Sequence, residues 1–114
     1  METSKIITKK DLVKYATDER NKLLYSICFD ENDFNSLKHY VGKIISQLDA
    51  ALHANPKGYV NLEIQISKLK TELEKKPRDA EAKYLCREVR QEVLIGLKKI
   101  ISDNSQKSET QKMK

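Results

Sequence analysis

The sequence predicts an all-α fold, an antiparallel helical bundle of three to four helices, and three observations carry that prediction. Apolar residues recur at helical spacing through four segments of the chain. Short polar or proline-containing stretches separate these segments. The 114 residues, 39% of them apolar, are enough for one domain with one core. Helices with apolar stripes bury them against one another, and a left-handed bundle is the usual arrangement.

The first helix is expected to begin after a short flexible arm, residues 1–8. The Thr8 hydroxyl can accept the amide hydrogen of Asp11, whose carboxylate can accept one in return, as in a capping box. Apolar residues then form a stripe one face wide to about residue 28: Leu12, Val13, Ala16, Leu23, Leu24, Ile27 and Cys28. A polar run follows, in which Asp33 is expected to cap the next helix. Whether the first helix packs in the bundle or swaps into a dimer stays open.

The second helix has the most regular pattern in the chain. Its apolar residues follow steps of 3, 4, 3, 4 and 3, which make a heptad seam: Phe34, Leu37, Val41, Ile44, Leu48 and Ala51. The helix is expected to end at Asn55, because Pro56 disfavours helical geometry in the residue before it. Gly58 can adopt a positive φ, which predicts a tight turn and an antiparallel third helix.

The third segment begins with the alternation of a strand, at Val60, Leu62, Ile64 and Ile66, but its continuation favours a helix to about Lys76. A helical line with steps of 3, 4, 3 and 4 runs through it: Tyr59, Leu62, Ile66, Leu69 and Leu73.

Pro77 and Asp79 mark a break and a new N-cap before the last helix. That helix has an apolar line and is expected to end near Asp103: Ala82, Cys86, Val89, Val93, Leu97 and Ile100. The predicted domain organisation is an arm over 1–8, a helical bundle over 9–103 and a disordered basic tail over 104–114. The tail contains one apolar residue, Met113, and therefore cannot bury enough surface to offset its ordering entropy.

The net charge of +5 is concentrated at the two ends of the chain. Residues 1–10 and 104–114 carry +2 each, so the interior holds only +1. This distribution favours solubilising ends over a nucleic-acid surface. The sequence contains neither an apolar run of membrane-spanning length nor a signal-peptide pattern. We therefore expect a soluble, cytoplasmic protein with no membrane, nucleic-acid or small-molecule partner.

The histidines and cysteines predict neither a metal site nor catalysis. His39 and His53 lie roughly 21 Å apart along one helix and cannot share an ion. Cys28 and Cys86 are expected to pack in the core as free thiols. A reactive thiol is the alternative, because Arg87 follows Cys86 and a positive neighbour lowers a thiol pKa. Neither cysteine has a histidine beside it to act as a base, so the sequence predicts no enzyme and no cofactor.

A basic stretch crosses the break into the last helix and is the best candidate for contact with an anionic partner: Lys75, Lys76, Arg78, Lys83, Arg87 and Arg90. Acidic residues are interspersed with it, so a solvated, salt-bridged face is the favoured interpretation. Only Tyr84 among seven aromatic residues lies within it, whereas proteins that bind single-stranded nucleic acid stack bases on aromatic side chains.

Part of the chain resembles the BAG domain. The resemblance covers about residues 38 to 103 and rests on Tyr59-Val-Asn-Leu-Glu63, a heptad ending in Glu72-Leu-Glu74, and Arg90-Gln-Glu-Val-Leu-Ile-Gly-Leu-Lys-Lys-Ile-Ile101. It implies a three-helix bundle whose second and third helices bind the nucleotide-binding domain of Hsp70 chaperones and promote nucleotide release. In the family pattern Arg90 matches a contact arginine and Glu74 a contact aspartate, whereas Lys98 stands where the family has glutamine.

Two functions of different class follow from the sequence. The first is a BAG-like cochaperone that acts as a nucleotide exchange factor of Hsp70, with partner-binding residues on the last two helices: Glu63, Glu74, Arg87, Arg90 and Lys98. In this hypothesis Arg90 is exposed and, with Glu74, reaches the partner across the groove between those helices. The alternative is a small helical-bundle binding, immunity or regulatory protein of bacterial or phage type that acts by protein–protein contact.

Overall fold

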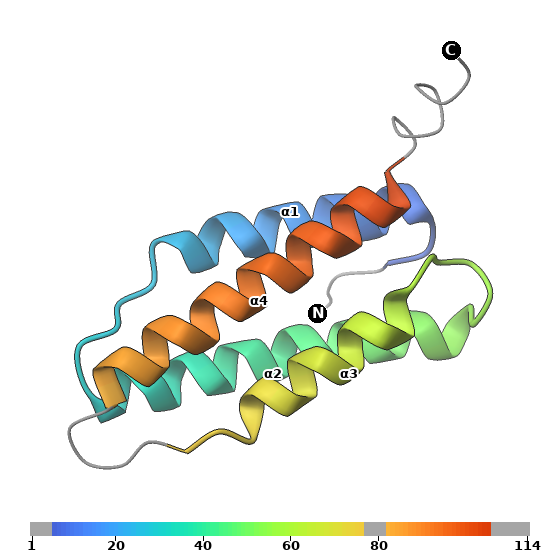
Figure 1. Cartoon of the computed structure of the whole chain (residues 1–114). Coiled ribbons are helices and arrows are strands. Elements are labelled where there is room, and N and C mark those ends of the chain that lie inside the picture. Colours follow the sequence, from blue (N-terminus) through green and yellow to red (C-terminus); the bar gives the residue numbers. More distant parts are fainter. Residues whose placement is uncertain (1–5, 77–81, 106–114) are drawn as a thin grey trace.

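The computed structural model describes residues 6–76 and 82–105, and within them the chain forms four helices and no strand (Figure 1). These are α1 (Lys9–Leu24), α2 (Glu31–Ala54), α3 (Leu62–Leu73) and α4 (Ala82–Asn104). Successive helices run in opposite directions. The predicted all-α antiparallel bundle is confirmed.

Helix α4 is the central element, because it packs against each of the other three helices. Helix α1 lies along α4, and α2 pairs with α3 and with α4 (Figure 1). The first helix therefore packs within the bundle of its own chain. This answers the question, left open by the sequence, of whether it packs in the bundle or swaps into a dimer.

The apolar stripes predicted for α2 and α4 face the core. Every residue of the α2 seam is buried, and so is every residue predicted on the α4 line. Helix α3 buries Leu62, Ile66 and Leu69, while Val60 and Ile64 are exposed. The helical period thus overrides the strand-like alternation at the start of this segment.

Helix α1 ends at Leu24, earlier than the predicted residue 28. The Ser26 hydroxyl donates to the Leu23 carbonyl at 2.8 Å, and the Ser26 amide donates to the same oxygen at 3.0 Å. A serine that satisfies a terminal carbonyl in this way competes with continuation of the helix. As a result Ile27, predicted on the apolar stripe, is 59% exposed.

The capping residues were predicted correctly for α1 and wrongly for α2. Thr8 and Asp11 form the reciprocal capping box. The backbone amides of Thr8 and Ile7 that donate to the Asp11 carboxylate lower the pKa of Asp11. At α2 the N-cap is Asp30, whose carboxylate accepts a hydrogen bond from the Asp33 amide at 3.0 Å. The Asp33 carboxylate in turn accepts one from the Phe29 amide in the preceding loop.

The turn from α2 to α3 uses a different residue for its positive φ than the sequence suggested. Gly58 does not adopt one, whereas Asn61 does, at φ 57°. Gly58 instead leaves room for the Asn55 side chain, which would have to move if Gly58 carried a Cβ, because the Cβ would lie 1.9 Å from Nδ2 of Asn55. Asparagine is among the few residues that tolerate the left-handed region.

The bundle extends to Asn104, which the sequence assigned to the tail. Its side chain is 2% exposed and forms a pair of hydrogen bonds with the α2–α3 turn. The Val60 amide donates to Oδ1 at 2.7 Å, and Nδ2 donates to the Val60 carbonyl at 3.1 Å. The expected disordered tail beyond residue 105 and the predicted cap at Asp79 lie outside the described residues.

Candidate functional site

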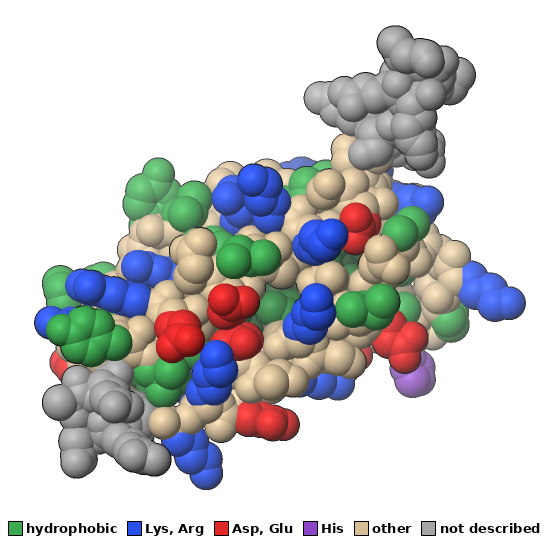
Figure 2. Space-filling model, viewed as in Figure 1, with side chains coloured by type: hydrophobic (Ala, Val, Ile, Leu, Met, Phe, Trp, Pro, Cys, Tyr) green, Lys and Arg blue, Asp and Glu red, His purple; other side chains and the backbone are tan. Residues whose placement is uncertain are grey.

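The segment between α1 and α2, residues 25–30, carries the two most exposed large hydrophobic side chains of the described chain, Tyr25 and Phe29. Tyr25, Phe29 and Ile27 are 85%, 70% and 59% exposed, and Leu24 at the end of α1 is 45% exposed. We call residues 25–30 the link, and these four side chains the link surface. Figure 2 shows hydrophobic side chains at the end of the bundle where the link lies. An apolar cluster of this kind marks an interaction site more often than does a single exposed residue.

A cavity of about 490 Å³ opens beside the link surface, between the link and the first turns of α2. The residues around it come from the end of α1, from the link and from α2: Lys22, Tyr25, Ser26, Ile27, Asp33, Ser36, Leu37 and Tyr40. Its size falls in the usual range of ligand pockets, roughly 300 to 1,000 Å³. The cavity therefore has room for an apolar side chain of a partner.

Tyr40 closes one side of this cavity and is held by α1. Its hydroxyl donates a hydrogen bond to the Glu19 carboxylate. Partial burial, the hydrogen bond to Glu19 and the negative charge of that carboxylate all raise the pKa of Tyr40. The phenol therefore stays protonated at neutral pH and acts as a hydrogen-bond donor between the two helices.

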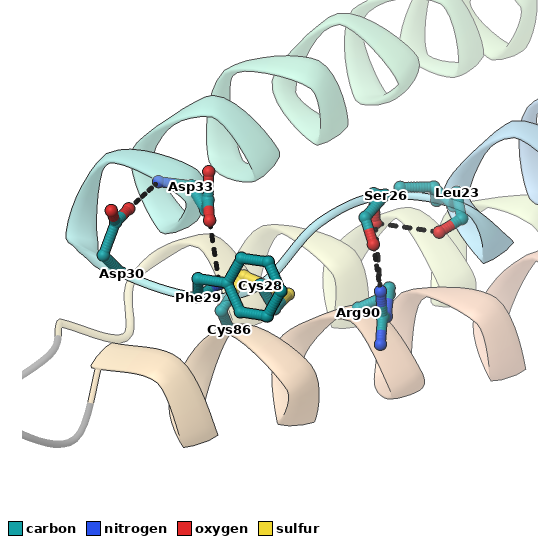
Figure 3. The surroundings of a disulfide bond; sticks show 8 residues. All are labelled: Leu23, Ser26, Cys28, Phe29, Asp30, Asp33, Cys86 and Arg90. Atoms are coloured by element: carbon teal, nitrogen blue, oxygen red, sulfur yellow. Dashed lines mark hydrogen bonds between the residues drawn. A yellow bond between two sulfur atoms is a disulfide. The ribbon is translucent and has the colours of Figure 1, made fainter.

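The link is joined to α4 by a disulfide between Cys28 and Cys86 (Figure 3). The two Cα atoms are 5.6 Å apart, within the range that a disulfide spans. The prediction of free thiols is therefore wrong, although both residues are buried as expected. Sequence reasoning missed the pair because 58 residues separate its members and only the packing of the link on α4 brings them together.

Arg90 makes a second connection between the link and α4, one helical turn after Cys86 (Figure 3). Its Nη1 donates to the Ser26 carbonyl and lies 3.4 Å from Ser26 Oγ. The side chain is half-buried, so the expectation of an exposed Arg90 is wrong. Its charge is used within the molecule to hold the link.

The structure does not bring the sequence-predicted partner residues into one groove. Glu63 is exposed in the first turn of α3, whereas Glu74 is exposed directly after its last turn. Arg87 and Lys98 are exposed on α4, 11 residues apart. The groove between α3 and α4 is lined by other residues: Gln65, Lys68, Leu69, Glu72, Glu92, Ile95, Gly96 and Lys99.

The α3–α4 face has mixed charge. Acidic and basic side chains are interspersed over it (Figure 2). Nζ of Lys75 lies 2.9 Å from Oε1 of Glu72 and 4.0 Å from Oε2 of Glu88. Part of the predicted basic stretch therefore forms ion pairs. Arg78 lies outside the described residues. The solvated, salt-bridged interpretation of the basic stretch fits these contacts.

His39 and His53 are both exposed on α2. No three metal-binding side chains come together in residues 6–76 and 82–105. Over the same residues, no helix has the length and apolar character that crossing a bilayer demands.

The link surface itself was missed by sequence reasoning. The available signal was the alternation of Tyr25, Ile27 and Phe29, which departs from the helical period of the preceding stripe. Extending the first helix to about residue 28 concealed that signal.

Comparison with protein-family models, with curated proteins and with solved structures finds no match to this chain.

Proposed function

We propose that the protein is a non-enzymatic interaction module that binds an apolar segment of another protein at the link surface. The observation that carries this proposal is the exposure of Tyr25, Ile27 and Phe29 within six residues of chain. Aromatic side chains dominate binding energy at protein interfaces, and tyrosine is among the most enriched of them. A binding or regulatory protein of bacterial or phage type, the alternative from the sequence, belongs to this class.

The geometry around the link supports the proposal in two ways. The cavity beside Ile27 offers a recess for one apolar side chain of the partner. The disulfide and Arg90 hold the link on α4, so less conformational entropy is lost on binding. The occupant that suits these features is an amphipathic segment that places one large apolar residue in the cavity and others over Tyr25 and Phe29.

A peptide-display selection against the full chain tests this function. Selected peptides should share a large apolar residue and bind with micromolar affinity measured by calorimetry. Phe29→Ser and Ile27→Ser should each weaken that binding at least tenfold, because they remove exposed contact area without disturbing the core. Ile64→Ser is the matched control, because Ile64 is also an exposed apolar residue, 52% exposed, but lies on α3. Equal losses in all three variants, or none in the link variants, would contradict the proposal.

The Hsp70 hypothesis is a second candidate, and the arrangement of α2, α3 and α4 supports it. These three helices form the antiparallel three-helix unit that the BAG resemblance implies, and Glu63, Glu74, Arg87 and Lys98 are free of the core. Arg90 would have to leave Ser26 to reach a partner. The structure therefore favours the link surface over this face as the main binding site.

Binding of the purified chain to an Hsp70 nucleotide-binding domain, followed by release of labelled ADP, tests the second candidate. A BAG-like factor should accelerate release, Glu74→Ala should reduce that effect, and Lys98→Gln should increase it, because glutamine can both donate and accept. Phe29→Ser should leave it unchanged. An absence of binding at high micromolar concentration would remove Hsp70 as the partner and leave the link proposal intact.

A further inference from the structure

We propose that the Cys28–Cys86 disulfide is a redox latch: its reduction releases the link from α4 and switches off binding at the link surface. The release follows from the geometry alone, whereas its effect on binding rests on the proposed function. Cys28 lies in the chain between Ile27 and Phe29, two members of the link surface. This placement couples the disulfide directly to the link surface.

Among the described residues, two side chains of α4 hold the link by covalent or polar contacts. Cys86 forms the disulfide, and Arg90 donates to the Ser26 carbonyl and lies 3.4 Å from Ser26 Oγ. The remaining hydrogen bonds of the link are local. Ser26 bonds back to Leu23 in α1, and the Phe29 amide donates to Asp33 in α2 at 2.8 Å. Reduction thus removes one of two connections to α4 and leaves the ends of the link attached to α1 and α2.

Most of the apolar core lies outside the link. The core contains the α2 seam and the α4 line from Cys86 onward, and Cys28 is the one link side chain that belongs to it. Regions with few buried contacts open at much lower free energy than the core does. Release of the link is therefore expected as a local change within a folded bundle.

The chemistry of release is a thiol–disulfide exchange that requires a dithiol reductant, a thioredoxin-type protein. Both cysteines are buried, Cys28 at 5% exposed and Cys86 at 0%, so the reaction requires a local opening of the link. A thiolate of the reductant then attacks Sγ of Cys28, and the Cys86 thiolate leaves. The second thiol of the reductant then resolves the mixed disulfide. Two electrons pass to the chain, Cys28 and Cys86 each end as a protonated thiol, and the reductant ends as a disulfide.

The sequence predicts a cytoplasmic protein, and in that compartment the disulfide would be exposed to thiol–disulfide exchange. Disulfides in the cytosol of most organisms are transient and usually serve catalysis or redox sensing, because thiol systems keep cysteines reduced. A cytoplasmic protein with this pair would move between its oxidised and reduced forms. The ends of the link stay bonded to α1 and α2 after reduction, which keeps Cys28 within reach of Cys86 and allows the disulfide to form again.

Reduction should also lower affinity at the link surface. The cavity is lined partly by the link, through Tyr25, Ser26 and Ile27, so its shape depends on where the link is held. A link that samples many positions must be ordered on binding, which costs affinity. We expect at least a fivefold weaker complex with the reduced chain.

Amide hydrogen exchange on the oxidised and thioredoxin-reduced full chain tests the latch without any partner. Exchange at residues 25–30 should accelerate at least tenfold on reduction, while α2 around Leu48 keeps its protection and the melt stays cooperative. The double variant Cys28→Ala with Cys86→Ala is the control, since it should show the fast link exchange and no response to the reductant. Calorimetry with a display-selected peptide then measures the effect on binding.

Each result has a defined meaning. Unchanged exchange in the link, or global unfolding of the reduced chain, overturns the latch whatever the peptide does. Faster link exchange with unchanged peptide affinity overturns its control of binding. If display yields no peptide that depends on Phe29, the proposed function fails, yet the exchange measurement still decides whether reduction releases the link.

Discussion

Arg90 and Asn104 show how single polar side chains of α4 fasten the connections between helices. Each bonds to backbone groups more than 40 residues away in sequence: Arg90 to Ser26 and Asn104 to Val60. Hydrogen bonds of this kind satisfy backbone groups that no helix can pair. Arg90 therefore fixes the link on α4, and Asn104 fixes the α2–α3 turn on the end of the same helix. The sequence around these two residues does not reveal either role.

Asn104→Ala should lower the free energy of unfolding by about 1 to 3 kcal/mol, because the amide and the carbonyl of Val60 lose their partner. Urea unfolding followed by circular dichroism measures the change. Lys99→Ala, an exposed residue of the same helix, is the control and should shift the midpoint little. Equal stability of the Asn104 variant and the parent would place this residue in the tail, as the sequence suggested.

Arg90→Ala should lower the free energy of unfolding by about 1.5 to 3 kcal/mol, the usual range for a hydrogen bond to a charged group. The half-buried guanidinium donates to the part-buried Ser26 carbonyl. Arg87→Ala removes the same charge from an exposed position and should cost much less. A melting temperature that is as high for Arg90→Ala as for Arg87→Ala would show that the contact with Ser26 contributes nothing.

At the scale of the elements, the bundle depends on regular apolar seams. The α2 seam is buried over its whole length, from Phe34 to Ala51, because its 3-4 spacing keeps every member on one face. Such local periodicity was enough to predict every buried residue of the α2 seam and of the α4 line, although α2 begins three residues earlier than expected. The ends of α1 and α3 were predicted less well, since hydrogen bonds of Ser26 and the left-handed Asn61 decide them.

Leu48→Asp should unfold the bundle, because Leu48 is 0% exposed and an unpaired charge in an apolar core costs far more than a lost methylene group. The expected result is loss of the cooperative thermal transition in circular dichroism. Ser46→Asp places the same charge on the exposed face of α2 and should retain the transition. A cooperative melt of Leu48→Asp at the parent temperature would refute the packing of this seam.

The contact between α1 and α2 should make stability depend on alkaline pH. Burial, followed by the negative charge of Glu19, raises the pKa of Tyr15 above its usual 10.0, and Tyr40 shifts in the same direction. Between the unfolded and folded values the unfolded chain binds fewer protons. The stabilising effect is therefore complete below pH 10 and declines as the pH rises above it.

Urea midpoints measured from pH 8 to 11 test this dependence. The midpoint should stay level to about pH 10 and then fall, and the double variant Tyr15→Phe with Tyr40→Phe should show a weaker decline. Equal declines in the two proteins would mean that these phenols do not carry the effect.

For the whole molecule, the disulfide closes a covalent loop from the α1–α2 link to α4. Replacing both cysteines by alanine should lower the free energy of unfolding by about 2 to 4 kcal/mol, since a bridge across 58 residues restricts the unfolded chain. Denaturant unfolding of the oxidised chain and the variant measures the difference. A difference near zero would mean that the bridge adds no net stability.

The sequence by itself determined the helices, their order and the faces that they bury, because each follows from spacing within a few turns of chain. Only the tertiary structure decided that Cys28 pairs with Cys86, that Arg90 holds Ser26 rather than standing free, and that Ile27 is exposed. These features depend on where α4 packs against a link some 60 residues earlier. The link surface exists because α1 ends at Leu24, and helix ends are decided by individual hydrogen bonds that the apolar period does not encode.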